Sequence, residues 1–116
     1  MEANRLLLYL AQGVAGRLAD AATTYLATSL GLKELNPRVV PLLSNPPLFF
    51  ALQALAGLIM GFTPYIAESF ALVQAEKAGR RDLASLGRKA ALAIVALNWF
   101  PVPWNLTQAF FALVFR

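Results

Sequence analysis

The amino-acid sequence predicts an all-α membrane protein in which three transmembrane helices form one small bundle. Of the 116 residues, 59% are hydrophobic and only 14% are charged, whereas an ordinary soluble domain is about 25% charged. A soluble domain of this length could not bury so much apolar surface. Three apolar runs also exceed the ~20 residues that a helix needs to cross a bilayer. We therefore expect one integral membrane domain, 1–116, with helices at about 6–32, 47–75 and 89–115.

The first apolar run, 6–32, contains two charged residues. Arg17 and Asp20 would interrupt the apolar region of a secretory signal peptide, so we expect an uncleaved spanning helix. Arg17, Asp20 and Thr24 follow each other at i, i+3 and i+7, which places them on one helical face. A carboxylate in an apolar medium is costly, so Asp20 requires a partner or a function.

The second run has clear helix signals at its start and along one face. Asn45 followed by Pro46 predicts a capped helix start with proline at the first helical position. Gly57 and Gly61 form a G-x-x-x-G pair, which permits two helices to approach closely in lipid. Pro64 lacks a backbone donor and predicts a kink.

The third run carries a polar stripe and two prolines. Asn98, Pro101, Asn105 and Gln108 recur at intervals of 3, 4 and 3 residues and so share one face. Pro101 and Pro103 predict a second proline kink.

The charge distribution predicts the topology. The segment 76–89, expected to be a loop, contains five basic residues, Lys77, Arg80, Arg81, Arg88 and Lys89. Basic loops stay in the cytoplasm. We therefore expect a protein of the inner (plasma) membrane whose N-terminus and segment 76–89 lie on the cytoplasmic side. The loop 33–47 and the C-terminus are then extracytoplasmic. The ten Lys and Arg residues are too few and too scattered to indicate nucleic-acid binding.

This topology places polar residues of the first and third helices at one depth. Asp20 lies ~22 Å beyond Arg5, and Asn105 lies ~24 Å beyond Lys89. The candidate intramembrane site comprises Arg17, Asp20, Thr24 and Asn105. Two interpretations are open: polar contacts that hold three helices together, or an ion or proton path.

Several kinds of chemistry are excluded by composition. The chain has no Cys and no His, which excludes disulfides, thiol nucleophiles, His-ligated haem and the usual zinc sites. We expect no metal site and no cofactor, and the residues indicate no catalytic group.

A short motif resembles a known family. It has the form D-A-x-x-T-T followed by G-x-x-E-x-N-P, here Asp20, Ala21, Thr23, Thr24, Gly31, Glu34, Asn36 and Pro37. The pattern resembles domain of unknown function 5658, a family of small prokaryotic membrane proteins with three predicted helices. The resemblance implies the same fold and an outer-rim motif of Glu34, Asn36 and Pro37, with Asn105 as the family's late asparagine. No activity is established for the family, so no reaction is implied.

These observations favour a non-enzymatic membrane component that forms a homo-oligomer or serves as a small subunit of a membrane complex. Its expected partners are the lipid bilayer and membrane proteins, and not nucleic acid. The alternative is an ion or proton transporter, or a channel-like protein, that uses Asp20 and Asn105. A phage-type holin ranks lower, as does a membrane enzyme that acts on lipid with Asp20 or Glu34 as base.

Overall fold

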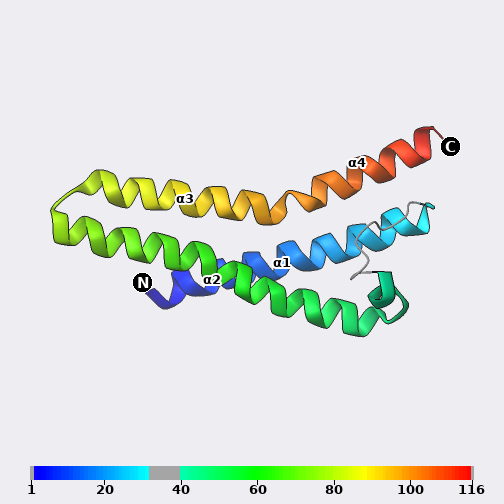
Figure 1. Ribbon diagram of the computed structural model, residues 1–116, viewed down its shortest axis with the longest axis horizontal. Helices are drawn as coiled ribbons and strands as arrows, with labels where there is room; N and C mark the ends of the chain where they lie inside the picture. The colour runs from blue at the N-terminus through cyan, green and yellow to red at the C-terminus, as the bar shows by residue number, and fades with distance from the viewer. Residues whose placement is uncertain (1, 32–39, 116) are drawn as a thin grey trace.

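The computed structural model describes residues 2–31 and 40–115, and this part of the chain is helical apart from short turns and contains no strand. Three long rods lie side by side, formed by α1, by α2, and by α3 with α4 (Figure 1). The elements in chain order are α1 (Glu2–Ser29), η1 (Val40–Ser44), α2 (Pro46–Ala78), α3 (Arg81–Trp99) and α4 (Pro101–Val114).

The helix α2 begins as predicted. The Asn45 side-chain Oδ1 accepts a hydrogen bond from the backbone N–H of Leu48 at 3.3 Å, and Pro46 occupies the first helical position. The helix then continues through Pro64, which is fully buried, and ends at Gly79. Gly79 has a φ of 66°, a left-handed conformation that glycine adopts without steric cost.

The segment 76–89 is not the loop that was expected. The helix α2 extends to Ala78 and α3 starts at Arg81, so only Gly79 and Arg80 connect them. The physical reason is that Lys, Arg and Glu are good helix formers, so a helix need not end where its apolar run ends. Gly87 of α3 is buried against Ala71 of α2, which draws this part of the segment into a tight helical hairpin.

The third rod breaks at the predicted proline. The residue Phe100 separates α3 from α4, and Pro101, which has no N–H to donate, begins the new helix. Phe100 keeps helical dihedral angles, φ −54° and ψ −40°, so the rod bends there without forming a loop. Figure 1 shows that α4 diverges from α2 beyond this bend, with α1 between them.

The interior contains small side chains, and the large apolar ones face outward. The buried hydrophobic residues are Ala21, Ala27, Phe49, Ala75, Ala91 and Ala109. In contrast, Leu8 is 72% exposed and Leu97 73% exposed. A soluble protein buries most of its Leu, Ile and Phe side chains, so this distribution is the inverse of a soluble core.

Two helical rods of the described chain are long and apolar enough to cross a membrane. They are Pro46–Ala78 and the combined rod Arg81–Val114. The helix α1 is not among them, and Gln12, Arg17 and Asp20 lower its hydropathy. Two such rods are weak evidence for membrane crossing, because the core helix of a soluble protein can have the same length and composition.

The glycine pair of α2 faces the backbone of α1. A Cβ atom on Gly57 would lie 2.7 Å from the carbonyl oxygen of Gly13, and one on Gly61 would lie 2.6 Å from that of Tyr9. Real Cβ atoms essentially never come so close to backbone atoms. The two helices thus pack at a distance that only glycine permits at these positions.

Candidate functional site

The structure brings Asp20, Thr24 and Asn105 together where α1 packs on α4. The side-chain Nδ2 of Asn105 lies 2.8 Å from Asp20 Oδ1, 3.0 Å from Thr23 Oγ1 and 3.3 Å from Thr24 Oγ1. An amide group has only two hydrogens to donate, so these acceptors share them. Thr23, a residue of the D-A-x-x-T-T motif that was not predicted in the site, is thus part of the cluster.

Arg17 joins this cluster to α2. Its Nη2 atom lies 2.9 Å from Asp20 Oδ2, forming an ion pair within α1. Its Nε and Nη2 atoms also donate to Gln53 Oε1, at 2.9 Å and 2.6 Å. Gln53 is absent from the predicted site, although a lone glutamine in the apolar run of α2 was a visible signal.

Both carboxylate oxygens of Asp20 are engaged by side chains of the cluster. Each carboxylate oxygen of Asp20 has a partner, Asn105 for Oδ1 and Arg17 for Oδ2. The side chains of Asp20 and Arg17 are only 15% and 21% exposed, and their charges cancel. The arrangement can therefore hold α2 and α4 against α1 without any ligand.

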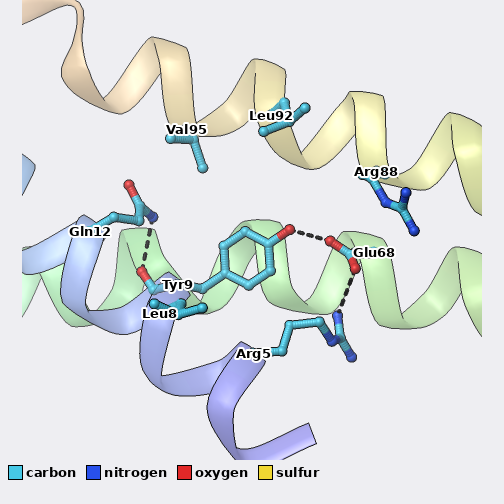
Figure 2. Close-up of a pocket in the computed structure, with 8 residues that line it drawn as sticks. All are labelled: Arg5, Leu8, Tyr9, Gln12, Glu68, Arg88, Leu92 and Val95. Atoms are coloured by element: carbon cyan, nitrogen blue, oxygen red, sulfur yellow. Dashed lines mark hydrogen bonds and ion pairs between the residues drawn. The ribbon is translucent and has the colours of Figure 1, made fainter. Parts of the chain in front are cut away.

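A second charged cluster lies nearer the α2–α3 turn and was not predicted. Glu68 is buried, and its Oε1 lies 3.4 Å from Arg5 Nη1. The Tyr9 hydroxyl donates to Glu68 Oε2 (Figure 2). Arg5 also donates to Ser69 Oγ at 2.8 Å, and its guanidinium lies 4.6 Å from the centre of the Tyr65 ring. Arg17 takes no part in this second cluster and contacts Asp20 and Gln53.

A pocket of about 410 Å³ opens beside this second cluster, between α1, α2 and α3. Tyr9 lies across the pocket with its hydroxyl toward Glu68, while Leu92 and Val95 approach from α3 (Figure 2). The pocket is lined by Arg5, Leu8, Tyr9, Gln12, Glu68, Arg88, Leu92 and Val95. We name this pocket, defined by those residues, the Arg88 groove.

Asn98, the first residue of the predicted polar stripe on α3, is 1% exposed. Neither its Nδ2 nor its Oδ1 has a hydrogen-bond partner among the described residues. A Cβ on Gly16 would lie 2.8 Å from Asn98 Nδ2, so Asn98 fills the space that Gly16 leaves.

The neighbouring Trp99 donates from Nε1 to Gln12 Oε1 at 3.1 Å. This contact adds a polar link between α3 and α1.

The outer-rim motif Glu34, Asn36 and Pro37 lies outside the described residues. Within the described part of the chain, no group of three or more acidic, His or Cys side chains could hold a metal ion.

No protein-family model, curated protein or solved structure matches this chain.

Proposed function

We propose that this chain is an integral protein of the inner membrane, crossed by α1, by α2 and by the α3–α4 rod. The observation that carries the proposal is the inverted distribution of side chains. Large residues such as Ile59, Phe70 and Leu97 are 64% or more exposed, while alanine and glycine fill the contacts between helices. In water, this outer surface would far exceed the apolar patches that monomeric proteins tolerate.

The orientation follows from charge. Five basic residues lie within 76–89, which covers the end of α2, the α2–α3 turn and the first half of α3. The positive-inside rule places this turn in the cytoplasm. The N-terminus is then cytoplasmic, and the segment 33–47 and the C-terminus are extracytoplasmic.

Because the chain contains no cysteine, single introduced cysteines can test this placement. Ser85 and Ser44 are both exposed and lie at opposite ends of the bundle. We expect a membrane-impermeant maleimide to label Ser44→Cys in intact cells and Ser85→Cys only after permeabilisation. The reverse pattern would refute the orientation, and release of the chain by alkaline carbonate would refute the membrane placement.

Within the membrane, the proposed role is that of a non-enzymatic component that associates with copies of itself. Both charged clusters are closed by their own side chains, which supports a structural role for them. The helix α4 instead presents exposed aromatic rings outward, with stacked pairs Phe100–Trp104 and Phe111–Phe115. Aromatic rings of this kind supply packing area between membrane helices.

Oxidative cross-linking can test the association face. Phe111 of α4 is 50% exposed and Leu58 of α2 is 40% exposed. We expect Phe111→Cys to form disulfide-linked dimers in native membranes, and Leu58→Cys to remain monomeric. Equal cross-linking at both positions would indicate random collision and contradict a specific association face. A discrete cross-linked complex with a different protein would instead indicate a small subunit of a larger membrane complex.

Ion or proton transport through the Asp20–Asn105 cluster is the competing function. It would require Asp20 to exchange its partners during each cycle, because both carboxylate oxygens are engaged. The saturated geometry therefore supports the structural role.

A further inference from the structure

The Arg88 groove combines a charged end and an apolar wall. Its apolar side chains are Leu8 of α1 and Leu92 and Val95 of α3, which frame the opening in Figure 2. Leu8 is 72% exposed and Leu92 is 59% exposed. The groove therefore offers an amphipathic surface, in which one part suits hydrocarbon and the other suits a polar or charged group.

The charges in the groove leave a net positive centre. The buried Glu68 carboxylate is balanced by Arg5 and also accepts from the Tyr9 hydroxyl. Arg88 is exposed and forms no hydrogen bond or ion pair with the described residues. The unmatched charge of the groove is therefore that of Arg88, which attracts an anion and repels a cation.

The surroundings have the same sign. Lys89 follows Arg88, and Lys77 and Arg81 lie beside the α2–α3 turn, where Arg80 is paired with Asp82. Basic pockets between transmembrane helices on the cytoplasmic side bind the head groups of anionic lipids. An Arg–phosphate pair is among the strong, charge-assisted hydrogen-bonded contacts.

We propose that the Arg88 groove binds one anionic glycerophospholipid of the cytoplasmic leaflet. Arg88 holds the phosphate, and the apolar wall formed by Leu8, Leu92 and Val95 receives part of an acyl chain. The inference rests on the membrane placement proposed above and goes beyond it, because it assigns a specific lipid site to a defined groove.

Native mass spectrometry of the full chain in a neutral detergent can test the proposal. The probes are phosphatidylglycerol and phosphatidylcholine with identical acyl chains. Both lipids carry the phosphate, but the choline cation of phosphatidylcholine cancels its charge and is repelled by Arg88. We therefore expect phosphatidylglycerol to bind about tenfold more tightly. We expect Arg88→Gln to abolish this preference. Lys89→Gln removes the same charge from the adjacent exposed residue, which does not line the groove, and should retain the preference.

The apolar wall has its own test. We expect Leu92→Asn to weaken the binding of both lipids, and Leu97→Asn, which alters an exposed leucine of α3 outside the groove, to leave it unchanged. Inorganic phosphate at millimolar concentration should fail to displace the lipid, since it lacks the acyl chain.

Three results would overturn the lipid site: equal affinity of the wild-type chain for both lipids, equal losses in Arg88→Gln and Lys89→Gln, or displacement by free phosphate. A chain that resists carbonate extraction but shows any of these results would retain the membrane placement and lose only the lipid site.

Discussion

Arg17 and Asp20 are paired at 2.9 Å within α1, yet each contacts a different neighbouring helix. Arg17 donates to Gln53 of α2, and Asp20 accepts from Asn105 of α4. The pair therefore links α2 and α4 through α1, in the part of the bundle where those two helices diverge (Figure 1).

Removing the Asn105 amide should weaken the packing of α4 on α1. Asn105→Ala deletes the hydrogen bonds to Asp20, Thr23 and Thr24. We expect a loss of roughly 0.6–1.7 kcal/mol in the free energy of unfolding, the range of polar contacts between membrane helices. Unfolding in mixed SDS micelles, followed by circular dichroism, measures this loss.

The control is Thr107→Ala, because the Thr107 hydroxyl bonds only to a carbonyl of its own helix, that of Pro103. The combination of Asp20→Asn with Asn105→Ala should destabilise the chain by less than the sum of the two single changes. Strict additivity would show that the two side chains are not coupled.

Enlarging Gly61 should separate α1 from α2. Gly61→Leu places a side chain against the backbone of Tyr9 and Leu10. Overpacking costs about 1–3 kcal/mol, and backbone neighbours cannot move aside as side chains do. Ala51→Leu makes the same kind of enlargement on an exposed position of α2 and should be neutral in the same SDS titration. A Gly61→Leu variant as stable as the wild type would contradict the close packing.

The buried Glu68 should contribute to the stability of the fold through its ion pair with Arg5. Glu68→Gln removes the carboxylate that lies 3.4 Å from the Arg5 guanidinium, and removing one partner of a largely buried ion pair is destabilising. Because the Arg5 side chain is 21% exposed, water offsets part of the cost, and we expect a loss of about 1–3 kcal/mol. The double variant Arg5→Gln, Glu68→Gln should recover much of this stability in thermal unfolding. No recovery would show that the ion pair is not the source of the loss.

Liposome flux measurements can separate the structural role of Asp20 from transport. We expect reconstituted wild-type protein and Asp20→Asn to show the same proton and cation leak as empty liposomes. A flux that appears with the wild type and disappears with a folded Asp20→Asn variant would instead establish the transport function.

Local signals made several features predictable. The cap at Asn45 and the break at Pro101 depend on neighbouring residues only, so the sequence is sufficient to predict them. The meeting of Asp20 with Asn105 follows from the rise of 1.5 Å per residue along two helices that run in the same direction from the same end of the bundle.

Contacts that depend on helix rotation and length were missed. The extra turns at residues 76–89 allow Gly87 to pack on Ala71 and bring Arg88 beside Glu68. The pairing of Arg5 with Glu68 depends on how α1 is rotated against the glycine face of α2. Helical periodicity gives the faces of each helix, but not which faces meet.

The Arg17–Asp20 pair also has a consequence for biosynthesis. Asn105 is 85 residues from Asp20 in the chain, and proteins are made from the N-terminus, so α1 emerges from the ribosome well before its α4 partner exists. Arg17, only three residues away, is available from the start. In the proposed membrane placement, this ion pair within one helix would neutralise the Asp20 carboxylate before α4 has been made, and the later helices would then add the remaining contacts.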